Sequence, residues 1–112
     1  MSRLSSHVLD VTLGRPARGM GLRLDVLDAG LWRAVGANVT DADGRAGDLL
    51  GGGALEVGTY RLTFETGPYF EAAGQPVFYP RVEVTFLVAA PGEHHHVPLL
   101  LAPFGYSTYR GS

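Results

Sequence analysis

The sequence contains no cysteine and no lysine, because all 9 of its basic residues are arginine. The absence of cysteine excludes disulfide bridges and thiolate chemistry, and the absence of lysine excludes catalysis through a Schiff-base lysine. No apolar run approaches the roughly 20 residues that a helix needs to cross a bilayer. Histidine, arginine, hydroxyl groups and carboxylates are therefore the side chains left for chemistry.

Charge and composition also limit what the chain can do. The formal net charge of −2 gives no general attraction to nucleic acid or to acidic membranes. Residues 1–7 (MSRLSSH) lack the apolar core and cleavage site of a secretory signal, so we expect a cytoplasmic protein. With 46% hydrophobic and 18% charged residues over 112 positions, residues 1–112 are expected to form one folded domain.

Alternating apolar and polar residues predict strands along most of the chain. The clearest are residues 21–28 (GLRLDVLD), 58–65 (GTYRLTFE) and 82–88 (VEVTFLV), each with every second residue apolar. The only helix we expect is a short one, over residues 68–74. Further strands are expected over residues 4–12, 31–35, 97–102 and 106–109. Seven or eight short strands separated by turns are typical of an antiparallel β-sandwich, an all-β fold.

The acidic, glycine-containing stretch 40–48 (TDADGRAGD) suggests a calcium loop at first sight. An EF-hand loop needs acidic ligands at alternating positions before its glycine and a closing glutamate, and this spacing does not supply them. Asx-turn chemistry is the better interpretation. Arg45 is the only cation of this loop.

Histidine is the residue type with the clearest chemical potential, since three of the 4 histidines are consecutive. On a strand, His94 and His96 project to one face and His95 to the other, which we expect to be the outer face. If this run pairs antiparallel with the strand that carries His7, imidazoles gather across a sheet. Such a cluster could bind zinc and activate water, or act directly as general base and acid. The alternative is a solvated polar strand edge without chemistry.

Four separated segments of the sequence resemble the 5-hydroxyisourate hydrolases, transthyretin-like enzymes of purine catabolism. The segments are LSSHVLD (4–10), GRPARGM (14–20), TDADGR (40–45) and HHHVPLLLAPFGYSTYRGS (94–112). The terminal YRGS is the most specific of them, because transthyretin, the hormone carrier with this fold, lacks it. The resemblance implies a transthyretin-like antiparallel β-sandwich.

The resemblance also implies roles for individual residues. The catalytic set of the family falls on His7, Arg45, His96 and Ser112, and substrate binding falls on Arg45, Tyr109, Arg110 and Ser112. The family's usual tyrosine between its two histidines is His95 here. This departure leaves His94 without an assigned role.

By resemblance, the substrate is 5-hydroxyisourate, and water opens its six-membered ring to give 2-oxo-4-hydroxy-4-carboxy-5-ureidoimidazoline without a metal or another cofactor. Four subunits assemble in the family as paired dimers, so a homotetramer is expected. Two alternatives remain: a transthyretin-like carrier of a small aromatic ligand, or a zinc hydrolase using His7, His94 and His96.

Overall fold

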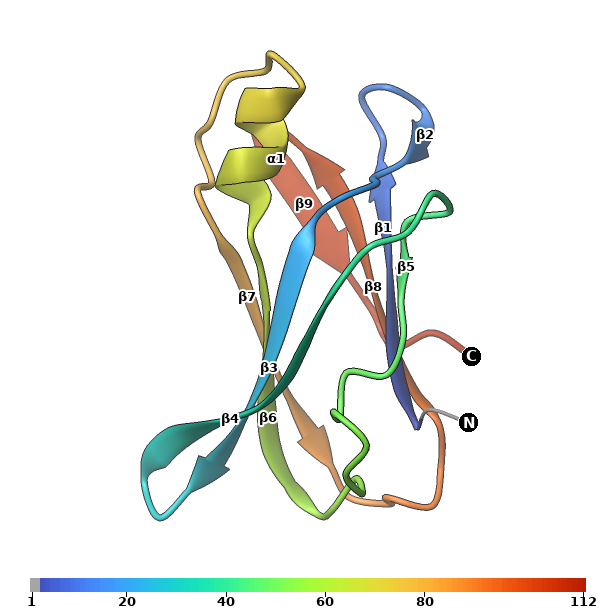
Figure 1. Cartoon of the computed structure of the whole chain (residues 1–112), viewed down its shortest axis with the longest axis vertical. Coiled ribbons are helices and arrows are strands. Elements are labelled where there is room, and N and C mark those ends of the chain that lie inside the picture. Colours follow the sequence, from blue (N-terminus) through green and yellow to red (C-terminus); the bar gives the residue numbers. More distant parts are fainter. Residues whose placement is uncertain (1–2) are drawn as a thin grey trace.

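The computed structural model describes residues 3–112, which form two β-sheets packed face to face with one short helix at one end (Figure 1). No helix in this range is long and apolar enough to cross a membrane. The elements are, in order, β1 (Leu4–Asp10), β2 (Arg15–Pro16), β3 (Gly21–Asp28), β4 (Leu31–Val39), β5 (Arg45–Ala46), β6 (Gly58–Phe64), α1 (Thr66–Ala72), β7 (Val82–Val88), β8 (His95–Ala102) and β9 (Gly105–Thr108).

Each sheet joins strands that lie far apart in the sequence. The first sheet has the order β2-β1-β8-β9, with β5 also pairing with β1, and the second has the order β4-β3-β6-β7. Every pairing is antiparallel except that of β1 with β8, which is parallel. The β-sandwich predicted from the sequence is confirmed. The histidine run and the His7 strand are neighbours, but they pair in parallel and not in the antiparallel arrangement considered from the sequence.

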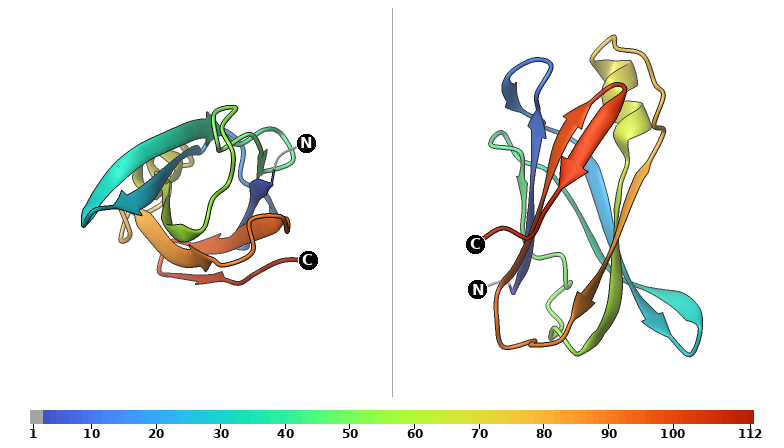
Figure 2. Two further views of the ribbon diagram at one scale, coloured as in Figure 1. Left: turned by 90° about the horizontal axis from the view of Figure 1, so that it is seen from below. Right: turned by 180° about the vertical axis from the view of Figure 1, so that it is seen from behind.

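The two sheets face each other (Figure 2). The core residues on β3, β6 and β8 follow the predicted alternation. On β6, Tyr60, Leu62 and Phe64 are all buried, as are Leu22 and Leu24 on β3. The facing side of β8 contributes further buried aliphatic residues: Val97, Leu99 and Leu101. Inward-facing residues therefore alternate along these strands with residues of the outer faces.

The element boundaries differ from the prediction where no alternation marks them. β4 continues to Val39 instead of stopping at Val35, because none of its residues is fully buried and its apolar pattern is correspondingly weak. The helix begins at Thr66, two residues early. There the Thr66 hydroxyl donates a 2.6 Å hydrogen bond to the carbonyl of Tyr79, which fixes the first turn against the chain leading into β7.

Candidate active site

The parallel pairing of β1 with β8 brings His7 and the histidine run onto one sheet. The register places Ser5 opposite His96 and His7 opposite Pro98. Ser5, His7 and His96 project from the outer face of the sheet, whereas the alternate residue of β1, Ser6, is buried in the interior. In Figure 2 this face is the outer surface of the layer that contains both chain ends.

Ser5 connects two of the histidines. Its Oγ lies 2.9 Å from Nε2 of His94 and 2.9 Å from Nδ1 of His96. The two imidazole ring centroids are 6.3 Å apart. Ser5 was not among the predicted site residues, although its position two residues before His7 on a strand indicated that both share a face.

The C-terminal segment packs directly onto His96. The Gly111 N–H donates a 2.8 Å hydrogen bond to the His96 carbonyl and forms an antiparallel bridge with it. A Cβ atom at position 111 would lie 2.5 Å from Cδ2 of the His96 ring, closer than real contacts allow. The YRGS sequence therefore needs glycine at this position for steric reasons, and the segment covers one edge of the imidazole.

The TDADGR segment is a turn that positions Arg45 on the same sheet. Asp41 Oδ1 accepts hydrogen bonds from the backbone N–H groups of Asp43 and Arg45, at 2.9 and 3.0 Å. The Arg45 N–H bond is the main cause that lowers the pKa of Asp41, which keeps this carboxylate ionised. Gly44 has a φ of +75°, and a Cβ there would lie 2.4 Å from the carbonyl oxygen of Val8.

This turn also determines which nitrogen of His7 is available. His7 pairs with Arg45 across the β1–β5 ladder, so the two side chains are neighbours. The Nε2 of His7 lies 2.8 Å from the carbonyl oxygen of Asp43. Because a carbonyl oxygen only accepts, Nε2 carries its hydrogen, and a neutral His7 has its lone pair at Nδ1.

The electrostatic environment favours the neutral form of His96. Burial is the largest cause that lowers its pKa, followed by the positive charge of Arg45 and then by His7 and His94. Among residues 3–112, none of the ion pairs includes Arg45. The face therefore carries the positive charge of Arg45 beside a His96 imidazole whose neutral form is favoured.

His95 points to the opposite side of β8 from His96, as predicted, but that side is the interior. Its side chain is 4% exposed and its Nδ1–H donates a 2.9 Å hydrogen bond to the carbonyl of Glu93. The expectation of an outer-face position for His95 is therefore wrong. The outer face of β8 is the one that carries His96, because the histidine run enters a strand whose next residue, Val97, belongs to the core.

The structure places the other predicted site residues around this cluster without gathering all their side chains. Tyr109 and Arg110 border a cavity of about 130 Å³ together with His95. Arg110 Nη2 lies 3.6 Å from the carboxylate of Glu93. Ser112 is exposed and follows directly after Gly111. The functional roles of these three residues stay predictions.

A zinc site formed by His7, His94 and His96 finds no support in this geometry. In the part of the chain from residue 3 to 112, no three His, Cys, Asp or Glu side chains are grouped so as to hold a metal ion. One nitrogen of His94 and one of His96 instead meet the same serine hydroxyl.

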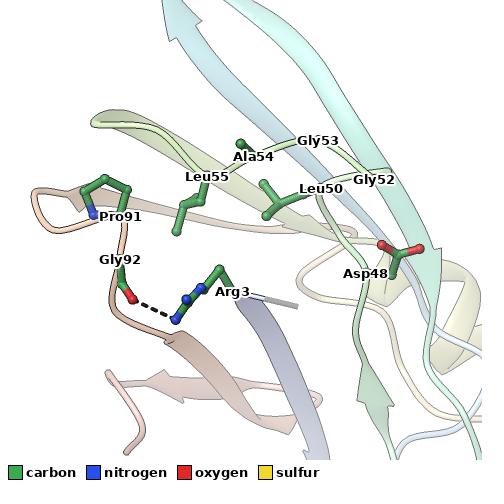
Figure 3. Close-up of a pocket in the computed structure, with 9 residues that line it drawn as sticks. All are labelled: Arg3, Asp48, Leu50, Gly52, Gly53, Ala54, Leu55, Pro91 and Gly92. Atoms are coloured by element: carbon green, nitrogen blue, oxygen red, sulfur yellow. Dashed lines mark hydrogen bonds between the residues drawn. The ribbon is translucent and has the colours of Figure 1, made fainter. Parts of the chain in front are cut away.

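A cavity of about 740 Å³ is lined by none of the residues of this cluster (Figure 3). Arg3 borders it and donates a 2.7 Å hydrogen bond to the carbonyl of Gly92, while Leu50 and Leu55 form an apolar wall. Asp48 is its one acidic lining residue, and no histidine lines it. His7 and His96 lie instead on the open face of β1 and β8.

Comparisons with known proteins agree with this arrangement. The model of the HIUase/Transthyretin family matches residues 4–111. The 5-hydroxyisourate hydrolase of Caulobacter vibrioides is 47% identical over 116 aligned positions that cover 100% of both chains. The structure of Klebsiella pneumoniae 5-hydroxyisourate hydrolase superimposes with a TM-score of 0.86 at 39% identity, covering 100% of both chains. The structure of sea bream transthyretin in complex with thyroxine superimposes with a TM-score of 0.91 at 33% identity, covering 97% of this chain and 94% of the transthyretin chain.

Proposed function

Because the chain belongs to the HIUase/Transthyretin family, we propose that it is a 5-hydroxyisourate hydrolase acting in urate degradation, in a single domain over residues 1–112. The similarity of the backbone does not by itself distinguish an enzyme from a carrier, since transthyretin superimposes as well as the hydrolase does. The observation that carries the proposal is the cluster of Ser5, His7, Arg45 and His96 on one sheet face. A carrier of a small aromatic ligand has no need of these groups.

In the proposed reaction, water adds to a ring carbonyl of 5-hydroxyisourate and the ring C–N bond breaks. A C–O bond forms, a proton leaves the water, and a proton reaches the departing nitrogen. His7 and His96 share these transfers, His7 through Nδ1, since its Nε2–H is held by Asp43. Each imidazole can take up the water proton and return a proton to the leaving nitrogen, so no external acid is consumed.

Charge stabilisation falls to Arg45. Hydrolysis of a carbonyl develops negative charge on its oxygen, and a preorganised cation beside it lowers the barrier. Arg45 lies opposite His7 and has no ion-pair partner among residues 3–112, so its planar fork of donors is available to substrate. Tyr109, Arg110 and Ser112 complete the proposed substrate site from the C-terminal segment.

The proposed assembly is a homotetramer of paired dimers. The face described above is open to solvent in one copy, whereas strong electrostatic catalysis needs water to be excluded. A second copy over this face would close it. Phe104 and Tyr106, at the β8–β9 hairpin, are 68% and 41% exposed and supply apolar contact area. The test of the assembly is its mass in analytical ultracentrifugation, which should be four times the monomer mass. The proposed location of the protein is the cytoplasm.

The test of function is the decay of freshly generated 5-hydroxyisourate, followed by ultraviolet absorbance. We expect the protein to accelerate the decay well above the spontaneous rate, and His96→Gln to lose about 10²- to 10⁴-fold of the acceleration, as removal of an acid–base group does. A rate equal to the spontaneous background would refute the proposal. Saturable binding of the same compound without turnover would favour a carrier instead.

A further inference from the structure

His94 has no role in the mechanism so far, yet its ring is tied to that of His96 through one hydroxyl group. Ser5 Oγ lies at 2.9 Å from both His94 Nε2 and His96 Nδ1. A serine hydroxyl has one hydrogen to donate and lone pairs to accept with. The three groups can therefore form a directed chain of hydrogen bonds, and its direction decides which nitrogen of His96 carries the proton.

The surroundings of His96 leave only one of its nitrogens for substrate. Nδ1 is occupied by Ser5, and the Cδ2 edge is covered by the backbone of Gly111. Nε2 is the remaining polar atom of the ring. To act as a base, Nε2 must have a lone pair, so a neutral His96 must carry its hydrogen on Nδ1.

Building on the proposed hydrolase function, we propose that Ser5 and His94 are a positioning pair that holds His96 in the Nδ1–H tautomer, with Nε2 bare and directed to the substrate. In this arrangement His96 Nδ1–H donates to Ser5 Oγ, and the Ser5 hydroxyl donates to the bare Nε2 of His94. Neither residue touches the reacting atoms.

The same contacts serve the charged state of the reaction. When His96 Nε2 takes up the proton of the attacking water, the ring becomes an imidazolium with a hydrogen on each nitrogen. Its Nδ1–H continues to donate to Ser5, so no hydrogen bond has to be rearranged during the transfer. A hydrogen bond to a charged donor is stronger than a neutral one, so this contact strengthens as the proton arrives. The pair therefore favours the state that follows proton uptake.

The neighbouring residue provides a built-in control. Ser6 points into the core and its Oγ donates a 2.6 Å hydrogen bond to the carbonyl of Val97, which is also on β8. Ser5 and Ser6 thus each link β1 to β8, one through a histidine ring and the other through the backbone. Removal of either hydroxyl breaks a contact between the same strands, but only Ser5 faces His96.

The test combines nitrogen NMR of the imidazole rings in ¹⁵N-histidine-labelled protein with pH profiles of kcat/KM. In the wild type, His96 should show a protonated Nδ1 and a bare Nε2. Ser5→Ala should lose this tautomer preference and lower kcat/KM by about 10- to 100-fold, the value of one charge-assisted hydrogen bond. Ser5→Thr, which keeps the hydroxyl on a β-branched side chain suited to a strand, should restore both. His94→Gln, whose amide oxygen can accept in place of Nε2, should exceed His94→Leu in activity.

Ser6→Ala should lower the melting temperature without changing the His96 tautomer or the pH profile. The proposal is overturned if wild-type His96 carries its hydrogen on Nε2, or if Ser5→Ala keeps the wild-type tautomer, whatever its activity. Failure of the hydrolase function would look different, because the wild type would then show the expected tautomer but no turnover of 5-hydroxyisourate.

Discussion

The outer faces of the two sheets both carry arginine, but in opposite circumstances. On the second sheet, Asp25 lies 3.3 Å from Arg23 and 3.4 Å from Arg61, and the Arg61 guanidinium sits 4.3 Å from the centre of the Trp32 ring. On the first sheet, Arg45 has no ion pair among the described residues 3–112 and faces imidazoles. The comparison teaches that charge compensation, and not residue type, separates a stabilising arginine from one available to substrate.

The largest effect that tests this comparison comes from replacing the two arginines in turn. Arg45→Gln removes the cation beside the developing negative charge, so we expect a loss of about 10²- to 10³-fold in kcat. The free energy of unfolding should change little. Arg61→Gln should instead lower the free energy of unfolding by about 1–3 kcal/mol, because buried Asp25 loses a charged partner. Its kcat should stay at the wild-type level.

Turnover of 5-hydroxyisourate and chemical denaturation, measured on both variants, separate these expectations. If Arg61→Gln were as inactive as Arg45→Gln, the contrast between the two faces would be wrong. If Arg45→Gln were mainly destabilised, Arg45 would be a structural residue like Arg61.

The sequence was sufficient for those parts of the molecule that depend on local periodicity. Alternation on β3, β6 and β7 marked the strands and their buried faces because one side of each meets the core. The two-residue strand β5 was read as part of a turn and β2 was not predicted as a strand, since both exist only through pairing with β1. Pairing direction is likewise a long-range property, and so the parallel β1–β8 contact was missed.

The candidate site was predictable only in part. The resemblance identified His7, Arg45 and His96, and the structure brings these three together. It did not reveal Ser5, because strand alternation places Ser5 on the face of His7 but shows no contact with His94 or His96 until β8 is placed beside β1. It also could not give the reason for Gly111, which becomes visible only when the His96 ring is in contact with it.

The second prediction compares two glycines near the C-terminal end. Gly111→Ala would bring a Cβ to 2.5 Å from the His96 ring, whereas a Cβ at Gly105 meets nothing within 4 Å. We expect Gly111→Ala to displace the ring or the terminal segment and to lower kcat/KM by about 10- to 100-fold, because small misplacements of a catalytic group are costly. Gly105→Ala should keep wild-type kinetics. Equal activity in the two variants would show that the contact with His96 has no role in catalysis.

The smallest expected effect is a shift in the pH dependence of kcat/KM, and it again distinguishes Arg45 from Arg61. The pKa of His96 is lowered by burial and then by Arg45, so the neutral base should persist below the ordinary imidazole value of about 6.5. The acid limb of kcat/KM should therefore lie below that value. As pH falls from 6.5 toward the lowered pKa, the unfolded chain binds a proton before the folded chain does, so the free energy of unfolding also declines over this range.

Arg45→Gln removes one of the causes that lower the His96 pKa. It should move the acid limb of the residual activity upward, toward the ordinary value. Arg61→Gln lies on the other sheet and should leave the limb in place. An unmoved limb in Arg45→Gln would mean that Arg45 does not lower the His96 pKa, and that its charge acts on the substrate but not on the base.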